Sequence, residues 1–501
     1  MSPFAEEGSS ARPATVIRAW IEEAAARHGD DVYLADARGK ATLTYAGLLD
    51  IVRETELRLD DVGLPPGARV NVRLADPLGY ATALVALVAA GRVAVPLDPA
   101  APDTDIARVL NVARPGGMVT TRPPGLRNWG ADGDGATPPF GIASFDLAPV
   151  TSDSDGGGIF LCTSGTTGTP KGILLREAQL AHVAAAVADW HRLTRADRGY
   201  CSLPLFHVNA EVVGVLATLR AGAYLALDGK FSKRDFWNLI GEDRITWINA
   251  VPAIISILSM NPPAAPPSRL RFVRSASAPL PLAALRRFEQ AVGVPVIETY
   301  GMTEAASMIT ANPLDGPRKP GSAGRPAGSQ VRIGEQAAPG EVGPGEVGRV
   351  LIRGAGVISG YASGGRPGAI DADGWLDTGD LGYLDADGYL FLAGRSDDVI
   401  NRGGEKIYPR EIEEILLAQP GVRSAAVIGA TDEVLGERPV AYVVADTDAM
   451  AGQLEAVLRE ACAQRLPRHK QPSEFWLVDE MPLGPTGKIA RRLLKESLAP
   501  R

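Results

Sequence analysis

The first hundred residues alternate between segments with the apolar spacing of a helix and short apolar runs, and this alternation limits the possible folds more than any other feature. Helical spacing recurs over residues 15–28 and 44–57, whereas residues 69–73 alternate in the manner of a strand. A helix predicted over residues 77–90 is followed by an apolar strand over residues 93–96. Strands that alternate with helices favour a parallel sheet covered by helices. We therefore predict an α/β fold.

Two changes of pattern divide the remaining chain. After residue 339, glycines separate short β-rich runs, as in residues 348–353 and 382–394, which predicts β-hairpins. From residue 398 onward, helical and β-rich runs follow one another closely, which predicts a compact α+β unit. We therefore expect a domain boundary near residues 395–398. Residues 122–139 are rich in Gly, Pro and Asp and are expected to form a surface loop.

Composition argues against several classes of protein. The net charge of −8 disfavours general nucleic-acid binding, which needs concentrated Lys and Arg. Cys162, Cys201 and Cys462 lie far apart without CxxC spacing, and the five histidines show no zinc-binding pattern. The N-terminus has no apolar signal core, and no apolar run is long enough to span a membrane. We expect a cytoplasmic protein.

The strongest chemical signal is the run T-S-G-T-T-G-T-P-K-G over residues 163–172, directly after an apolar strand predicted over residues 158–162. Its three glycines allow the backbone to come close to a ligand, and its five hydroxyl side chains supply donors. Lys171 adds a mobile cation, so the run can cradle a triphosphate. It is not a Walker A loop, because Gly172 stands where that motif has Ser or Thr. The structural alternative is a polar turn between two strands.

This loop resembles the phosphate-binding signature of the adenylate-forming superfamily, which includes acyl-CoA synthetases, adenylation domains and luciferases. Seven further segments resemble motifs of that family and occur in its order: residues 202–207, 275–280, 298–304, 374–380, 394–398, 401–414 and 485–488. The resemblance implies a large N-terminal domain, residues 1–395, of packed, parallel-rich sheets and helices plus a distorted β-barrel. It also implies a small mobile α+β domain, residues 396–501, that turns about a hinge at Asp397.

The resemblance assigns three groups of contacts to ATP or AMP. The phosphate loop supplies Thr163, Ser164, Gly165, Thr166, Thr167 and Gly168. The adenine side is formed by Ser275, Ala276, Ser277, Glu298, Thr299, Tyr300, Gly301 and Met302. Thr303 contacts the α-phosphate, Glu304 is a hard oxygen ligand for Mg²⁺, and Asp380 and Arg395 hold the ribose. Each assignment has an alternative: Tyr300 as a core aromatic, Glu304 as a solvated charge, and Asp380 with Arg395 as a salt bridge between domains.

The implied reaction has two halves. A carboxylate is already a nucleophile at neutral pH, so the first half needs charge neutralisation rather than a general base, and Lys488 and Lys171 supply positive charge. In the second half a thiol approaches past Gly403 and Gly404, with Lys406 near the CoA phosphates. The alternatives are a solvated lysine near a basic C-terminus for Lys488 and a simple hairpin turn for the two glycines.

The acyl pocket is the least defined part of the site. By resemblance His207 gates it, the alternative being a buried core histidine, and its walls are formed by Val208, Asn209, Val212, Val213, Ala278 and Met302. Many of these side chains are small and apolar, which predicts a medium-chain or long-chain, aryl or terpenoid acid. Residues 271–280 and 318–322 also resemble the branch with oxalyl-CoA synthetases, so a small dicarboxylate stays open, although it needs a second cation. Glu211 places a carboxyl group near this pocket.

We therefore predict an acyl-CoA synthetase that uses ATP, Mg²⁺ and coenzyme A. One alternative is a stand-alone adenylating enzyme that loads a phosphopantetheinyl carrier protein or passes its adenylate to a partner enzyme. Another is a nucleotide-binding homologue without catalysis. A serine hydrolase is disfavoured because the sequence has no GxSxG elbow. A homodimer is kept open.

Overall fold

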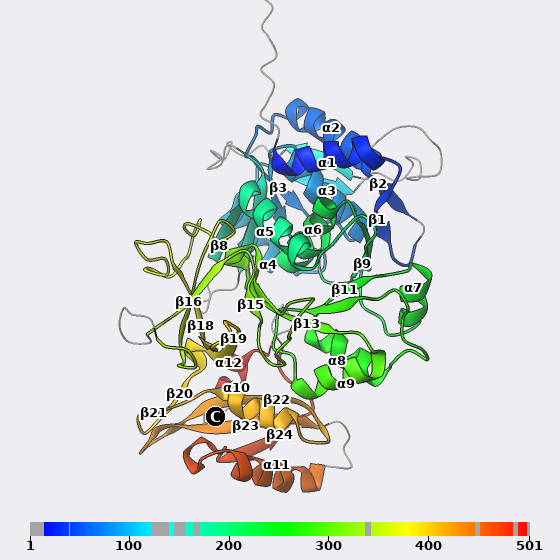
Figure 1. The fold of residues 1–501 in the computed structure, drawn as a ribbon. Helices are drawn as coiled ribbons and strands as arrows, with labels where there is room; N and C mark the ends of the chain where they lie inside the picture. Colours follow the sequence, from blue (N-terminus) through cyan, green and yellow to red (C-terminus); the bar gives the residue numbers. More distant parts are fainter. Residues whose placement is uncertain are drawn as a thin grey trace, which may run out of the picture. The chain divides into compact units, whose positions relative to one another are not determined.

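The computed structural model describes residues 15–39, 41–121, 140–144, 156–163, 171–335, 342–445, 451–483 and 489–497 (Figure 1). These residues form two compact units, which are described separately below. Unit 1 contains the chain up to residue 230 together with residues 361–365, and unit 2 contains the remainder from residue 231. The surface loop predicted over residues 122–139 lies outside the described residues.

A six-stranded sheet forms one half of unit 1. Its strand order is β6 (Phe140–Ser144), β5 (Gly117–Thr121), β3 (Arg69–Val72), β4 (Val93–Pro96), β7 (Gly158–Thr163) and β8 (Lys171–Arg176). The four inner strands are parallel and the two edge pairs are antiparallel. Helix α3 (Pro77–Ala89) joins β3 to β4 and α4 (Asp103–Ala113) precedes β5. The predicted parallel sheet is therefore confirmed, and the strand expected over residues 93–96 has those bounds.

Helices at the start of the chain begin where threonine side chains cap them. Thr15 Oγ1 accepts a hydrogen bond from the Arg18 amide at 3.2 Å, and α1 (Val16–His28) follows. Thr44 Oγ1 accepts one from the Gly47 amide at 3.1 Å, and α2 (Tyr45–Asp61) follows. Such caps satisfy amides that the first helical turn leaves without partners. Helix α2 runs four residues beyond the predicted end because its apolar spacing continues to the buried Leu59.

The second half of unit 1 is built on four further strands. β9 (Arg198–Cys201), β10 (Tyr224–Leu227) and β1 (Val32–Asp36) are parallel neighbours, and β2 (Thr42–Thr44) pairs antiparallel with β1. Between β9 and β10 the chain forms the π-helix η1 (Asn209–Leu216) and the short helix α6 (Ala217–Ala221), and α5 (Glu177–Trp190) follows β8. Every residue of η1 is buried.

Unit 2 begins with a second strand–helix alternation. β11 (Trp247–Ala250), β12 (Phe272–Ser275) and β13 (Val296–Met302) are parallel, with α8 (Pro252–Met260) and α9 (Leu282–Val292) as the connections and α7 (Phe236–Glu242) before them. After the 3-10 turn η2 (Thr303–Ala305) the direction changes, because β13 pairs antiparallel with β14 (Ser307–Ala311), which pairs with β15 (Arg325–Pro326).

An antiparallel sheet follows in unit 2. It joins β16 (Gln330–Gly334), β17 (Gly348–Arg353), β18 (Leu376–Leu384) and β19 (Leu390–Arg395) in chain order. The hairpins expected after residue 339 are therefore confirmed, whereas the barrel stays a prediction.

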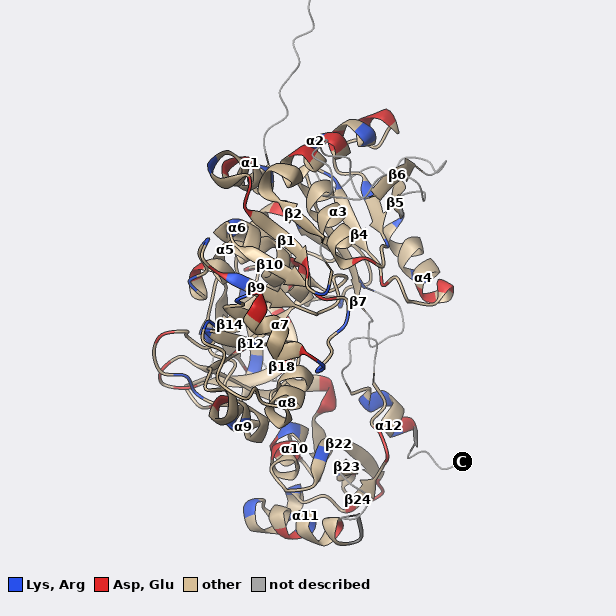
Figure 2. Cartoon of the chain, turned by 90° about the vertical axis from the view of Figure 1, so that its right-hand side faces the viewer, with Lys and Arg blue, Asp and Glu red and all other residues tan. Residues whose placement is uncertain are grey.

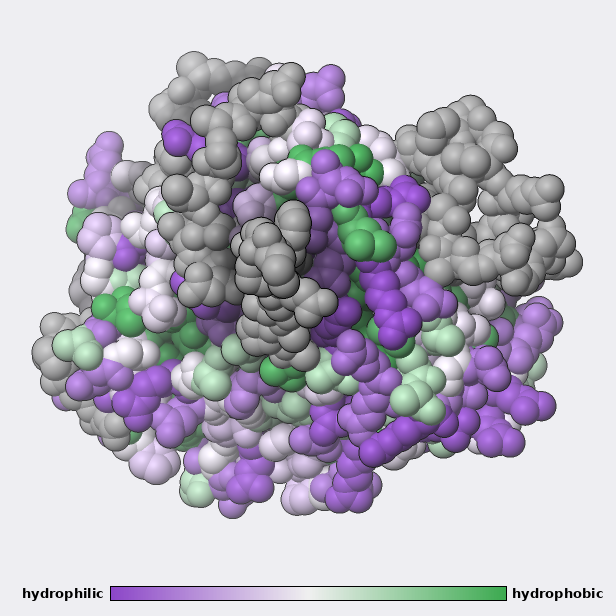
Figure 3. All heavy atoms as spheres, turned by 90° about the horizontal axis from the view of Figure 1, so that it is seen from above, coloured by the Kyte–Doolittle hydropathy of each residue, from purple (hydrophilic) through white to green (hydrophobic). Residues whose placement is uncertain are grey.

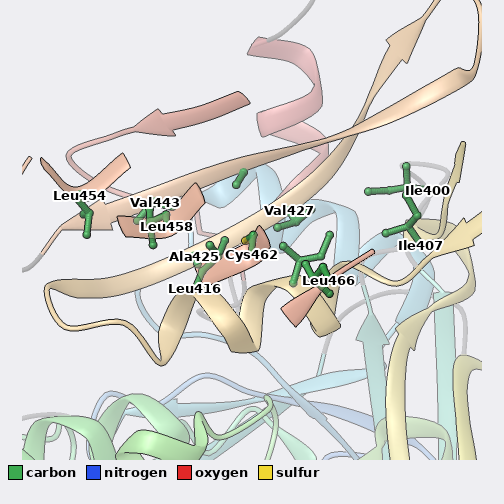
Figure 4. Packing of buried hydrophobic residues seen from close by; sticks show 12 residues of the cluster. Ile400, Ile407, Leu416, Ala425, Val427, Val443, Leu454, Leu458, Cys462 and Leu466 are labelled. Atoms are coloured by element: carbon green, nitrogen blue, oxygen red, sulfur yellow. The ribbon is translucent and has the colours of Figure 1, made fainter. Parts of the chain in front are cut away.

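The C-terminal part has the predicted α+β pattern. A single turn η3 (Ser396–Asp398) precedes β20 (Ile400–Arg402), β21 (Glu405–Ile407), α10 (Pro409–Leu417), β22 (Val422–Asp432), β23 (Gly436–Ala445), α11 (Ala451–Arg465), the turn η5 (Arg468–Lys470), β24 (Glu474–Leu477) and α12 (Arg491–Ser497). The five strands form one sheet. Its apolar core joins Ile400 and Ile407 to side chains of α10, β22, β23 and α11, as Figure 4 shows for Leu416, Val427, Val443 and Leu458. The boundary at residue 395 stays a prediction.

The described surface is mixed in charge and polarity. Basic and acidic residues lie close together on helices such as α1 and α2 (Figure 2). The face seen in Figure 3 is largely hydrophilic where residues are coloured, with smaller hydrophobic groups between. Among the described helices, none has the length and apolar character that crossing a membrane would require.

Candidate active site

Strand β13 and the turn after it carry most of the residues predicted for adenine and metal. Glu298 and Thr299 are buried, and Tyr300 and Met302 are half-buried. A β-bulge lies between Tyr300 and Gly301, where β13 approaches β14. A Cβ on Gly301 would lie 1.6 Å from the Ser307 carbonyl oxygen, so only glycine fits. The glycine thus serves a backbone contact within unit 2.

A cluster of Tyr300, Asp380 and Arg395 joins β13 to the β18–β19 hairpin. Tyr300 Oη donates to Asp380 Oδ2 at 2.5 Å, and Arg395 Nη1 donates to Asp380 Oδ1 at 3.1 Å and to the Thr378 carbonyl at 3.0 Å. Asp380 and Arg395 are direct partners across the hairpin. Gly379 has φ of +76°, and a Cβ there would lie 2.8 Å from Arg395 Nη2. The three residues predicted from separate motifs are therefore brought together.

Burial and the neighbouring Asp380 shift the pKa values of Tyr300 and Arg395. Burial, and then the neighbouring Asp380, raise the pKa of Tyr300 well above its usual value, so the phenol stays a hydrogen-bond donor. For Arg395, burial lowers the pKa, but the Asp380 carboxylate outweighs it and the net shift is upward. The Arg395 guanidinium therefore keeps its positive charge beside Asp380. A carboxylate held by two donors on a rigid hairpin is a suitable acceptor for paired hydroxyl groups.

Glu298 is engaged inside unit 2. Its carboxylate accepts from the Gly321 amide at 2.9 Å, and its carbonyl accepts from the Asn312 amide at 2.9 Å. It also lines a small pocket of about 130 Å³ together with Glu289, Arg318 and Lys319. Burial raises the pKa of Glu298 to about 7, although the Gly321 amide opposes that shift. The adenine contact assigned to Glu298 stays a prediction.

The loop after β12 is held in an unusual backbone conformation. The Ser275 carbonyl accepts from Thr299 Oγ1 at 2.9 Å, which ties the loop to β13, and Ala276 is buried. Ser277 has φ of +75°, a conformation that costs a non-glycine residue about 1 kcal/mol or more. Ser277 and Ala278 are exposed. A strained, exposed loop on a fixed strand end is typical of ligand contact.

The turn with Thr303 and Glu304 is also constrained. The Thr303 carbonyl accepts from the Ala306 amide at 3.0 Å, and the Glu304 carbonyl accepts from the Ile358 amide at 2.9 Å. Glu304 is buried. Within the described ranges, no group of three His, Cys, Asp or Glu side chains could hold a metal ion. A single carboxylate fits Mg²⁺, which usually binds one or two protein oxygens with waters and substrate phosphates.

The ends of the predicted phosphate loop are antiparallel partners in unit 1. Thr163 ends β7 and Lys171 begins β8, and the two residues are paired across the strands. Ser164, Gly165, Thr166, Thr167 and Gly168 lie outside the described residues. The Lys171 ammonium lies 5.6 Å from the ring centroid of Tyr361. Sequence reasoning missed Tyr361, because a contact over 190 positions leaves no local signal.

His207 lies at the entrance to the π-helix η1. Its ring is half-buried, 4.6 Å from the Phe206 ring, and its carbonyl accepts from the Glu211 amide at 3.2 Å. The predicted pocket residues of η1 and the residue before it are all buried: Val208, Asn209, Val212 and Val213. π-helical turns are rare and occur frequently at functional sites. Glu211 is fully buried, and burial raises its pKa well above the usual value.

The residues predicted for the hinge and the thiol approach lie at the start of the C-terminal part. Asp397 is in the turn η3. Gly403 and Gly404 have φ of +59° and +91° and form the turn between β20 and β21, which is the conformation that two-residue hairpins require. Gly404 and Lys406 are exposed. Gly403 and Gly404 therefore do form a hairpin turn. That they also line the approach of the thiol stays a prediction.

Lys488 lies outside the described residues, but the helix after it is attached near the predicted hinge. Arg491 at the start of α12 forms ion pairs with Glu413 at 2.7 Å and with Asp398 at 3.6 Å. Burial lowers the pKa of Arg491, but Glu413 and Asp398 outweigh it and raise the pKa. Sequence reasoning treated Arg491 only as part of a basic terminus, because its acidic partners lie far away in the chain.

Comparison with known proteins shows the family to which the chain belongs. The family described as AMP-binding enzyme matches residues 21–362, and the AMP-binding enzyme C-terminal domain matches residues 411–488. The chain is 37% identical over 495 residues to a sulfoacetate–CoA ligase of Cupriavidus necator, covering 95% of this chain and 96% of the relative. It is 34% identical over 493 residues to an oxalate–CoA ligase of Arabidopsis thaliana, covering 91% of this chain and 94% of the relative.

Solved structures show the same likeness. ATP-bound MatB from Rhodopseudomonas palustris superposes with a TM-score of 0.83 at 27% identity, covering 96% of this chain and 98% of that one. An o-succinylbenzoate CoA synthetase from Bacillus subtilis, in complex with its acyl-adenylate intermediate, superposes with a TM-score of 0.79 at 27% identity. The match covers 95% of this chain and 97% of that one. The chain therefore belongs to the AMP-binding enzymes, the adenylate-forming superfamily of acyl-CoA synthetases.

Proposed function

We propose that this protein joins a carboxylic acid to coenzyme A through an acyl-adenylate, with release of AMP and pyrophosphate. The observation that carries the proposal is the cluster of Tyr300, Asp380 and Arg395, in which residues from three motifs meet at the Asp380 carboxylate. The family membership and the ligase relatives support the same reaction.

In the first half-reaction an oxygen of the substrate carboxylate attacks the α-phosphorus of ATP. The bond between the α-phosphorus and the bridging oxygen breaks, and pyrophosphate leaves with the electron pair. Thr303 donates to the α-phosphate, and Lys488 neutralises charge between the carboxylate and the α-phosphate. Asp380 accepts from the ribose hydroxyls and holds the nucleotide in place. Mg²⁺, bound through Glu304 and the phosphates, would supply Lewis-acid stabilisation of the transferred charge.

In the second half-reaction the CoA thiolate attacks the carbonyl carbon of the acyl-adenylate. The bond between that carbon and the oxygen shared with phosphorus breaks, and AMP leaves with this oxygen and the electron pair. Gly404 is exposed at the tip of a tight hairpin, so a slender pantetheine arm can pass beside it. Lys406, also exposed, offers a cation to the CoA phosphates. Rotation about Asp397 would withdraw Lys488 from the acyl-adenylate and bring this hairpin to it. The carrier-protein alternative uses the same chemistry on a protein-bound pantetheine.

The acid that we propose is short and bears a second anionic group. The two relatives above are named for sulfoacetate and oxalate, which are acids of that kind. Arg274 on β12 supports this, because its side chain is only 1% exposed, one residue before Ser275, and Nη1 donates to Asn249 Oδ1 at 3.2 Å. We propose that this guanidinium supplies the second cation that a two-anion acid requires. The bulky apolar acid predicted from small pocket residues is the competing substrate class.

A panel of acids tests the proposal. Pyrophosphate release is measured for short two-anion acids and for medium-chain, aryl and terpenoid acids, each with and without CoA. CoA consumption with a short two-anion acid is the expected result. Release without CoA consumption would favour the carrier-protein alternative, and no acid-dependent release would contradict adenylation. Light scattering on the same sample decides between a monomer and the homodimer that the sequence leaves open.

A further inference from the structure

Residues 361–365 form a strap across the start of β8. Although the residues on either side belong to unit 2, these five pack with unit 1. The Ala362 amide donates to the Gly172 carbonyl at 2.9 Å, and the Gly172 amide donates to the Ser363 carbonyl at 3.0 Å. This pair of backbone hydrogen bonds is an antiparallel bridge. The strap is therefore fixed to the residue that follows Lys171.

Gly172 is required for this contact. A Cβ there would lie 2.6 Å from Ser363 Oγ and 2.7 Å from Phe160 Cζ. Both distances are shorter than real carbon contacts allow, so a larger residue would push the strap away from β8. The glycine that distinguishes the loop from a Walker A motif thus has a structural use: it lets the strap lie against the strand.

The strap presents one aromatic ring to Lys171. The Lys171 ammonium lies 5.6 Å from the centroid of the half-buried Tyr361 ring, within the range of a cation–π contact. On the strap itself, a Cβ on Gly365 would lie 2.3 Å from Tyr361 Cδ2. Gly365 therefore lets the strap fold back closely on the ring and holds its orientation. Among the described residues, no carboxylate forms an ion pair with Lys171.

This arrangement matters because lysine is a flexible cation. Its side chain has about 2 kcal/mol of rotamer entropy, part of which is lost whenever the ammonium is held at one place. A carboxylate partner would hold it but would also cancel its charge. An aromatic face holds the ammonium while leaving its charge and donors available to an anion. A ring is therefore a suitable device for keeping a phosphate-binding lysine ready.

We propose that Tyr361 is a positioning residue, which holds Lys171 for the triphosphate of ATP through the strap. This inference rests on the proposed function of Lys171 in phosphate binding. The strap also follows closely on Ile358, whose amide donates to the carbonyl of Glu304, the residue proposed for Mg²⁺. One short segment of chain thus forms backbone hydrogen bonds with Glu304 within unit 2 and with Gly172, next to Lys171, within unit 1.

A double-mutant cycle tests the inference. Tyr361→Leu removes the ring face, Tyr361→Phe retains it, and Lys171→Met removes the cation; each single variant and the Leu–Met double variant are assayed for kcat/KM with ATP. An exposed or partly exposed cation–π contact implies about a two- to fivefold loss for Tyr361→Leu. Tyr361→Phe should stay close to wild type. In the Lys171→Met background, Tyr361→Leu should add no further loss, since the ring acts through the ammonium.

Two matched variants separate positioning from general stability. Gly365→Ala should displace the ring without altering it and should reproduce the loss of Tyr361→Leu. Tyr224→Leu removes another ring in unit 1, the one 3.5 Å from the Arg198 guanidinium, and should leave kcat/KM for ATP unchanged in both backgrounds. Equal losses from Tyr361→Leu with and without Lys171 would overturn the inference, as would a full loss in Tyr361→Phe.

Failure of the inference is distinguishable from failure of the proposed function. Acid-dependent exchange of pyrophosphate into ATP by the wild type establishes adenylation independently of Tyr361. If the wild type shows no such exchange, the proposed function fails, and the same cycle is then measured as the dissociation constant for ATP by calorimetry. Coupling between Tyr361 and Lys171 in that binding measurement still supports the inference, and additivity overturns it.

Discussion

Replacing Glu211 by glutamine should stabilise the protein by an amount that grows with pH. The side chain is 0% exposed, and neither carboxyl oxygen has a hydrogen-bond partner among the described residues. Burial therefore raises its pKa well above the usual 4.5. Tyr80 on α3 is close enough for Glu211 to raise its pKa as well, after the larger effect of burial. Burial thus favours the neutral form of this carboxyl group.

The sign of the pH dependence follows from proton binding. Above pH 4.5 the unfolded chain releases the proton of Glu211 while the folded chain keeps it, so the folded state binds more protons and the free energy of unfolding falls as pH rises. The fall is about 1.4 kcal/mol per pH unit and ends where the carboxyl group ionises in the folded state. Glutamine has no proton to release, so its advantage over glutamate grows at that rate. For unit 1, which comprises residues 1–230 and 361–365, this is roughly 3–6 °C per pH unit in Tm.

Scanning calorimetry of the wild type and Glu211→Gln between pH 5 and 8 checks this. Glu433→Gln is the matched control, because Glu433 is exposed and its replacement should give the same Tm difference at every pH. A Tm difference for Glu211→Gln that does not change with pH would refute the reasoning. It would mean that the carboxyl group is ionised or solvated in the folded protein.

Three further substitutions address the proposed site. Lys488→Ala should greatly slow adenylation but largely spare thioester formation from a supplied acyl-adenylate; equal loss in both assays would refute that division. Gly404→Leu should largely spare adenylation but greatly slow thioester formation, because the leucine side chain would project at the exposed hairpin where the thiol is proposed to pass. Unchanged CoA dependence would show that Gly404 does not line the path of the thiol. Tyr300→Phe removes the 2.5 Å hydrogen bond to Asp380 and should lower the free energy of unfolding by about 1.5–3 kcal/mol, as read from thermal unfolding; an unchanged Tm would show that the bond contributes nothing.

Local features of the fold were predictable from sequence because their causes are local. The strand over residues 93–96 is apolar throughout and is buried throughout, so its pattern and its environment coincide. The start of α2 follows from Thr44, whose side chain must accept from the Gly47 amide for the helix to begin there. The meeting of Tyr300 with Asp380 was expected only through the family resemblance, since 80 positions separate the two residues.

Features that depend on packing between distant segments were not predictable in this way. Sequence showed that Glu211 adds a carboxyl group near the pocket, but only the fold shows that both oxygens are buried without partners among the described residues. Glu298 belongs to a nucleotide motif, yet its carboxylate is used by the Gly321 amide. The strap is the clearest case, because nothing around Tyr361 in the sequence indicates that it returns to Lys171.

The salt bridge of Asp380 with Arg395 lies within the β18–β19 hairpin rather than between domains, and it does not exclude a role of Asp380 as a ribose acceptor. An ionised carboxylate has about four acceptor positions on its two oxygens, and Tyr300 and Arg395 each occupy one of them. Two positions therefore stay available for a pair of ribose hydroxyls. Tyr300 and Arg395 also fix the carboxylate in place, so a ribose would meet an acceptor whose orientation is already determined. Because ordering the acceptor then costs little at the moment of binding, the salt bridge supports the ribose site that the motif predicts.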